Sequence, residues 1–81
     1  MVKQITLYTR QSCPLCDEMR LMLELLKEDF PLAIEEVDIE IDDDIHEKYM
    51  LMIPVVEYKN QIIQYGNADY VGLYEALDEH V

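Results

Sequence analysis

The sequence has few basic residues, no tryptophan and no long apolar run. Six Lys and Arg stand against eighteen Asp and Glu among 81 residues, which gives a formal net charge of −12. A nucleic-acid binder needs clustered cations to contact phosphate, and an anionic membrane surface also attracts basic segments. No apolar stretch approaches the roughly 18 residues of a membrane-spanning helix. We therefore expect neither nucleic acid nor membrane among the partners of this protein.

The first residues lack the features of a secretory signal. A signal peptide has a basic start, an apolar middle and a cleavage site of small residues, and residues 1–6 show no such build. We therefore expect a cytoplasmic protein. The length predicts a single domain over residues 1–81, and 51% hydrophobic residues are enough to form its core.

Cysteine is also scarce, and both cysteines lie in the stretch Cys13-Pro14-Leu15-Cys16. A bridge that closes so short a loop stabilises a fold by only about 2 kcal/mol and joins no distant segments. In a small cytoplasmic protein such a pair is more often chemical than structural. Residues three apart on a helix share a face, which brings the two sulfurs within disulfide reach.

Four short segments that alternate or are rich in β-forming residues are predicted as strands: residues 4–8, 33–38, 54–58 and 61–65. The polar residues 9–12 are predicted as a loop after the first strand. Lys59 and Asn60 form a two-residue polar turn, so the last two strands are predicted as a hairpin.

The first helix is predicted to begin within the cysteine motif. Pro14 suits the first helical position, where its missing N–H costs nothing, and Cys13 then takes the cap position. Apolar residues recur along one face of this helix at 15, 19, 22, 23 and 26. Pro31 marks the end of the helix.

Two further helices are predicted in the second half of the chain. One follows the acidic residues 42–44 and reaches about Met50, with Asp44 and Glu47 forming a capping box. Asp69 is expected to cap the other helix. The apolar face of that last helix consists of Tyr70, Leu73, Tyr74, Leu77 and Val81.

The predicted order of elements is β-α-β-α-β-β-α. The first β-α-β unit needs a crossover connection and therefore a parallel, right-handed strand pair. The hairpin adds antiparallel strands. The sequence thus predicts an α/β fold with a mixed four-stranded sheet and helices on both faces.

Three motifs together resemble those of glutaredoxins. They are Cys13-Pro14-Leu15-Cys16, then Met52-Ile53-Pro54-Val55-Val56, then Gly66-Asn67-Ala68-Asp69. From about residue 3 to about residue 77 the chain is similar to the short glutaredoxin-like family of the thioredoxin-fold superfamily. The resemblance implies a thioredoxin-like fold and a dithiol–disulfide oxidoreductase. The chain differs from glutaredoxins in having Leu15 in place of the usual tyrosine, and Asn67 in place of a second glycine.

Thiol–disulfide exchange needs an exposed thiolate and a second thiol within reach. Cys13 is the candidate nucleophile, because a thiolate at the helix cap meets free backbone N–H groups and the positive end of the helix dipole. Cys16, one turn inside the helix, is expected to be more buried and to resolve the mixed disulfide. Pro14 and Leu15, between the two cysteines, are expected to lie against the substrate.

The resemblance implies further substrate contacts. In the family the proline before the third strand is cis and the residue before it pairs with the substrate through its backbone, which implies these roles for Pro54 and Ile53. Arg10 takes the position of a lysine that meets a glutathione carboxylate, and Asp69 matches an aspartate that meets the γ-glutamyl amine. The implied substrate is a disulfide-bonded protein or a thiol. No cofactor is required, and the candidate electron donors are glutathione, another low-molecular-weight thiol and a reductase.

Other uses of the cysteine pair remain open as alternatives. The pair can be two small core residues, half of a zinc site or part of an iron–sulfur cluster bridged between two chains. His46 and His80 are the only further nitrogen or sulfur ligand candidates and lie 34 residues apart, so no metal site is expected. The alternative function is a redox-responsive thioredoxin-like binding module with little turnover.

The acidic stretch is the feature that supports this alternative. Residues 35–47 hold eight carboxylates and no Lys or Arg. We expect most of them to form a solvated face and to cap helices. The other interpretation is a docking surface for a basic partner, whose attraction would be lost at high salt.

Overall fold

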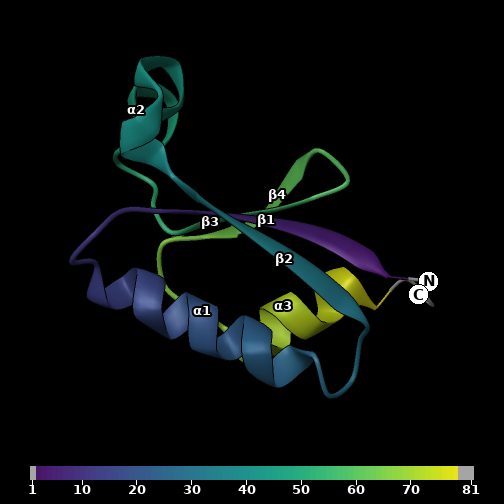
Figure 1. The fold of residues 1–81 in the computed structure, drawn as a ribbon. Coiled ribbons are helices and arrows are strands. Elements are labelled where there is room, and N and C mark those ends of the chain that lie inside the picture. The colour runs from purple at the N-terminus through teal and green to yellow at the C-terminus, as the bar shows by residue number, and fades with distance from the viewer. Residues whose placement is uncertain (1, 79–81) are drawn as a thin grey trace.

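The computed structural model describes residues 2–78 and confirms the predicted order of strands and helices (Figure 1). The strands are β1 (Lys3–Thr9), β2 (Leu32–Asp38), β3 (Val55–Tyr58) and β4 (Gln61–Tyr65). The helices are α1 (Pro14–Leu26), α2 (Asp43–Tyr49) and α3 (Tyr70–Leu77), with a single 3-10 turn, η1 (Ile39–Ile41), before α2. Val81, which was expected on the last helix, lies outside the described residues.

The four strands form one mixed sheet in the order β2-β1-β3-β4. β1 pairs in parallel with β2 and antiparallel with β3, which in turn pairs antiparallel with β4. Val55 at the start of β3 pairs with Tyr8 near the end of β1 and with Tyr65 at the end of β4. The loops that follow β1, precede β3 and follow β4 therefore meet at one end of the sheet. Because the loop after β1 leads to Cys13, we call this the cysteine end.

Two clusters of buried apolar side chains lie on opposite faces of the sheet, because successive residues of a strand point to opposite faces. Helices α1 and α3 cover one face (Figure 1). The cluster there consists of Ile5, Leu7, Met19, Leu23, Leu26, Val56, Tyr58, Leu73 and Leu77. The cluster on the other face, beside η1 and α2, consists of Ile39, Tyr49 and Val55. Helices therefore lie on both faces of the sheet, as predicted.

The β3–β4 hairpin has the predicted turn. Lys59 and Asn60 both lie in the left-handed region, with φ of 53° and 64°. Two successive positive φ angles are typical of a type I′ turn, whose twist matches that of the flanking strands. Within residues 2–78, no helix is both long enough and apolar enough to span a membrane.

The start of α2 differs from the prediction. Asp42 is the N-cap, and its carboxylate accepts hydrogen bonds from the backbone N–H groups of Asp44 (2.8 Å) and Ile45 (3.1 Å). The predicted capping box of Asp44 and Glu47 is therefore wrong, because Asp44 already lies within the first turn of the helix.

The end of β1 is a second correction. Thr9 was predicted in a polar loop but is the last residue of the strand and is buried. Its hydroxyl donates a hydrogen bond to Glu36 of β2, at 3.2 Å. A polar residue can therefore extend this strand, because the neighbouring strand supplies an acceptor.

Candidate functional site

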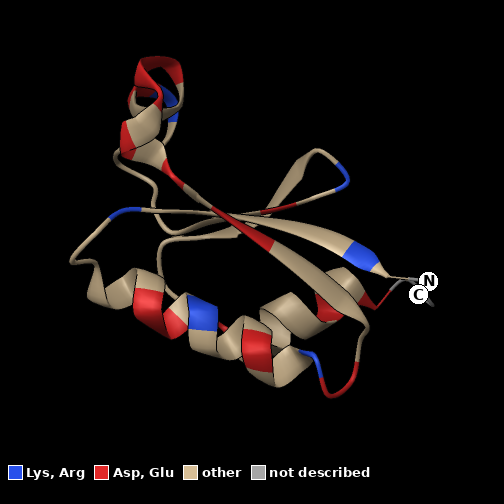
Figure 2. Cartoon of the chain, in the orientation of Figure 1, with Lys and Arg blue, Asp and Glu red and all other residues tan. Residues whose placement is uncertain are grey.

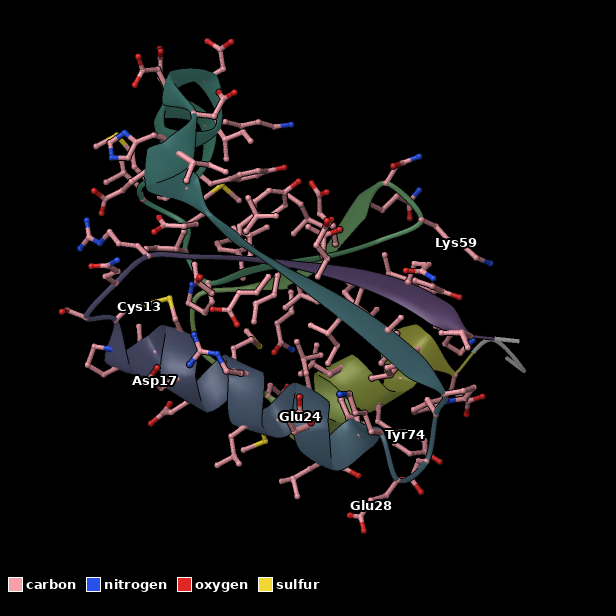
Figure 3. All side chains as sticks on the ribbon, viewed as in Figure 1. Cys13, Asp17, Glu24, Glu28, Lys59 and Tyr74 are labelled. Carbon is pink, nitrogen blue, oxygen red and sulfur yellow. A yellow bond between two sulfur atoms is a disulfide. The ribbon has the colours of Figure 1, made fainter. Side chains whose placement is uncertain are left out.

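The cysteine pair lies at the N-terminus of α1 (Figure 3). Cys13 is the N-cap residue and Pro14 is the first helical residue, as predicted. A disulfide joins Cys13 to Cys16, whose Cα atoms are 5.2 Å apart. The backbone N–H of Cys16 donates to Cys13 Sγ at 3.1 Å. The same N–H can stabilise a thiolate on Cys13, together with the positive end of the helix dipole.

The two cysteines differ in their access to solvent. Cys13 is half-buried, whereas Cys16 is completely buried. Pro14 and Leu15, which lie between them, are exposed. An incoming sulfur can therefore approach Cys13 over the surface formed by Pro14 and Leu15, and it cannot reach Cys16 directly.

The loop before β3 lies at the same end of the sheet. The Ile53–Pro54 peptide bond is cis; Pro54 is buried and Ile53 half-buried. The backbone N–H of Ile53 donates to the carbonyl of Tyr49 at 3.2 Å, and Gly66 N–H donates to the carbonyls of Met52 (3.1 Å) and Pro54 (2.9 Å). The carbonyl of Ile53 accepts no hydrogen bond from any residue in 2–78. This carbonyl is therefore the backbone group of Ile53 that has no hydrogen-bond partner within the described residues.

The loop between β1 and the cysteines borders a charged hollow of about 290 Å³. Arg10 is exposed and makes no ion pair or hydrogen bond with another residue of the described chain. Ser12, directly before Cys13, has a φ of 57°. The hollow is lined by residues 9–12 and by the charged side chains of Asp17, Arg20, Glu36 and Asp38.

Arg20 is fully engaged in ion pairs that the sequence did not reveal. Its guanidinium donates to Asp17 and to both carboxylate oxygens of Glu36, each at 2.7 Å. The hydrogen bonds from Arg20 lower the pKa of the Glu36 carboxyl, and those to Glu36 and Asp17 raise the pKa of Arg20. Because Glu36 lies on β2, Arg20 joins α1 to the sheet. Of the two arginines that line the hollow, Arg10 is the one without an ion pair in the described part of the chain.

Asp69 occupies the N-cap position of α3, but its side chain makes no cap hydrogen bond. The expectation that this carboxylate caps the helix is therefore wrong. The Gln64 side chain binds the backbone of Asp69 instead, accepting from its N–H at 2.9 Å and donating to its carbonyl at 3.2 Å. Sequence reasoning missed Gln64, because nothing in a strand pattern indicates that its side chain reaches the next helix.

Metal ligands are not gathered anywhere in residues 2–78. No group of three or more His, Cys, Asp or Glu side chains there is arranged to hold a metal ion. His80, which was one of the two histidine candidates, lies outside the described residues.

Comparisons with known proteins agree with this geometry. A family model described as "Glutaredoxin-like domain (DUF836)" matches residues 4–78. An X-ray structure of a structural-genomics target from X. campestris is 28% identical, with a TM-score of 0.79 over 91% of this chain and 95% of that chain. A solution NMR structure of a Nitrosomonas europaea protein is 20% identical, with a TM-score of 0.83 over 94% and 92% of the two chains. A malarial protein is 10% identical, with a TM-score of 0.69 over 100% and 99%. The fold is thioredoxin-like.

Proposed function

The chain belongs to the glutaredoxin-like domain family, and from this premise we propose that it is a dithiol–disulfide oxidoreductase that works through Cys13 and Cys16. The arrangement of the two cysteines carries the proposal. A half-buried cysteine at a helix N-terminus is bonded to a buried cysteine one turn inside the helix. That is the geometry needed for one attacking sulfur and one resolving sulfur.

The reaction takes place in two exchange steps. In the reduced protein, the Cys13 thiolate attacks one sulfur of the substrate disulfide, and the other substrate sulfur leaves as a thiolate. Cys16 then gives its proton to solvent and attacks Cys13 Sγ, which releases the second substrate sulfur. Two electrons have passed to the substrate, and the protein holds the Cys13–Cys16 disulfide.

The next turnover requires two electrons from outside the protein. Two molecules of glutathione or of another low-molecular-weight thiol, or a reductase, supply them by the same exchange chemistry in reverse. The cysteine pair is itself the redox centre, so the reaction requires no further cofactor. We place it in the cytoplasm, where thiols are kept reduced.

The residues around the pair orient the substrate. The free carbonyl of Ile53, beside Pro54, accepts a hydrogen bond from the substrate backbone. The exposed guanidinium of Arg10 attracts an anionic group. The carboxylate of Asp69, which is exposed and makes no cap bond, offers a partner for an ammonium group.

A redox titration in glutathione buffers, quenched with acid and read by intact mass, tests the proposal. We expect a reversible loss of two protons and two electrons, with a midpoint between about −180 and −270 mV. Related exchange proteins span roughly −120 to −270 mV. Cys16→Ser should accumulate a glutathione adduct on Cys13. The matched variant Cys13→Ser should not, because Cys16 is buried. An adduct of equal yield in both variants would contradict the assigned roles.

The acidic surface favours the second candidate, a redox-responsive binding module with little turnover. Figure 2 shows acidic residues gathered over η1 and α2. Six carboxylates of the stretch are exposed and cap no helix: Glu35, Glu36, Glu40, Asp43, Asp44 and Glu47. A module of this kind would form its disulfide reversibly without any glutathione adduct. It would also gain or lose a basic partner when the disulfide forms.

A further inference from the structure

An uncharged hollow of about 440 Å³ lies beside β4, the edge strand of the sheet. It is lined by Met52, Ile62, Ile63, Gln64 and Tyr65. Ile62 is 41% exposed and Tyr65 58% exposed, so apolar surface is open to solvent here. Charged residues make up 30% of the chain. The absence of a charged side chain from the lining therefore distinguishes this hollow from the charged parts of the surface.

The hollow is continuous with the cysteine end of the sheet. Tyr65 pairs with Val55, the residue after Pro54. The next residue, Gly66, donates its N–H to the carbonyls of Met52 and Pro54. β4 forms one wall of the hollow, and the residue that follows it is therefore hydrogen-bonded to the loop that carries the free Ile53 carbonyl.

The two hollows at the edges of the sheet differ in chemistry. The hollow on the β2 side is lined by charged residues, among them Arg10, Asp38 and Glu36. The hollow on the β4 side has only apolar side chains, one amide and one phenol. β2 and β4 are the opposite edge strands. A substrate bonded to Cys13 can therefore extend toward a charged wall on one side or an apolar wall on the other.

We propose that the hollow beside β4 is a side-chain subsite for polypeptide substrates. It takes a large apolar side chain from the extended segment whose cysteine is bonded to Cys13. β4 is an edge strand, so an extended segment can lie along it without displacing another strand. Burial of an apolar side chain against Ile62 and Tyr65 provides the binding energy.

This subsite rests on the proposed function and narrows its substrate class to disulfides held in polypeptides. Glutathione has two carboxylates and an ammonium group but no apolar side chain. A wall without charged side chains therefore offers the charged groups of glutathione no ion pair. The exchange step is the one described above, with a second cysteine of the polypeptide as the leaving sulfur.

Two disulfide-bonded peptides of equal length and charge test the subsite, with dithiothreitol as the reductant. One peptide has leucine two residues from its cysteine and the other has serine there. We expect kcat/KM of the wild-type protein to be at least tenfold higher for the leucine peptide. In the double variant Ile62→Ser/Tyr65→Ser, this preference should fall at least fivefold, while reduction of glutathione disulfide stays unchanged.

The control removes two exposed leucines elsewhere. Leu21 and Leu25 are 59% and 43% exposed on α1, and Leu21→Ser/Leu25→Ser should keep the tenfold preference. The wild-type comparison stands even if a variant does not fold, since it needs no substitution. Equal rates for the two peptides, or an equal loss in the control, would overturn the subsite but leave the proposed function intact. No turnover of either peptide or of glutathione disulfide would overturn both.

Discussion

The side chain of Gln64 makes two hydrogen bonds with the backbone of Asp69: its oxygen accepts from the N–H, and its nitrogen donates to the carbonyl. A residue of β4 thereby fixes the start of α3. Gly72 in the first turn leaves the necessary room. A Cβ at Gly72 would lie 3.0 Å from Gln64 Nε2 and 2.9 Å from Asp69 Oδ2.

We expect Gln64→Ala to destabilise the protein more than Asp69→Ala. The glutamine change removes two neutral hydrogen bonds and should lower the free energy of unfolding by about 1–2 kcal/mol. The aspartate change removes no cap bond, so its effect should stay below the roughly 1 kcal/mol usual for a lost N-cap. Urea unfolding of both variants measures the difference. Equal losses would mean that the carboxylate caps the helix after all.

A second prediction concerns the start of α2. Asp42→Ala removes the carboxylate that accepts from two backbone N–H groups, and it should cost about 1 kcal/mol of stability. Asp44→Ala is the matched control, since it removes the same charge from the first turn without removing a cap. Its effect should be a few tenths of a kcal/mol. Thermal or urea unfolding distinguishes the two, and a larger loss in the Asp44 variant would restore the capping box.

The ion pairs of Arg20 give a third prediction. Arg20→Gln breaks the ion pairs with both Asp17 and Glu36. We therefore expect the free energy of unfolding to fall by about 1 kcal/mol at low salt. The side chains of Arg20, Asp17 and Glu36 are 39% to 73% exposed, which keeps this value small. Lys27→Gln, the control, breaks a single exposed pair with Glu24 and should cost less than about 0.5 kcal/mol.

Salt separates this electrostatic effect from a packing effect. In 1 M sodium chloride the Debye length falls to about 3 Å, so the difference between the Arg20 and Lys27 variants should shrink. A loss in Arg20→Gln that does not change with salt would indicate that packing of its side chain, and not its charge, stabilises α1 on β2.

The fourth prediction concerns stability at alkaline pH. Burial, and then the hydrogen bond to Glu57, raise the pKa of Tyr49 to about 12. An unfolded tyrosine has a pKa of about 10. Between these values the folded protein keeps a proton that the unfolded chain loses. The stability that Tyr49 contributes is thus fully present below about pH 10 and is lost as pH rises toward about 12, by at most about 1.4 kcal/mol per pH unit.

Tyr49→Phe should remove the part of the stability loss at alkaline pH that comes from ionisation of Tyr49. Urea unfolding at about pH 9 and pH 11 should show a smaller decrease for the variant than for the wild type. Tyr8 also donates to Glu57, at 3.3 Å, and its pKa is raised mainly by burial, so some decrease will persist. An identical decrease in both proteins would show that Tyr49 ionises equally in the folded and unfolded states.

Local patterns were enough to predict the elements that depend on neighbouring residues. Pro14 after Cys13 marked the start of α1, and the pair Lys59-Asn60 marked the hairpin turn. The cap of α2 was assigned wrongly because three successive aspartates can each accept a backbone N–H. Only the path of the chain after η1 determines which of them lies outside the helix.

The contacts that the sequence did not reveal join residues far apart in the chain or on different elements. Arg20 and Glu36 are 16 residues apart, and Thr9 and Glu36 are 27 apart. Periodicity reports which face of an element is buried, but it does not report which polar side chains meet across two elements. The hollow beside β4 was missed for the same reason, since Met52 and Tyr65 meet only after the sheet forms.

The start of β1 and the end of α3 lie together at the sheet end remote from Cys13 (Figure 1). A linker, dye or solid support attached near Lys3 or Leu77 would therefore lie at the end of the molecule opposite the cysteine pair. Cys13, the more exposed of the two cysteines, would face the solution whichever of the two positions carried the attachment. The fold is thus suited to immobilisation on an electrode or to fusion with a fluorescent reporter, with its reactive sulfur presented outward.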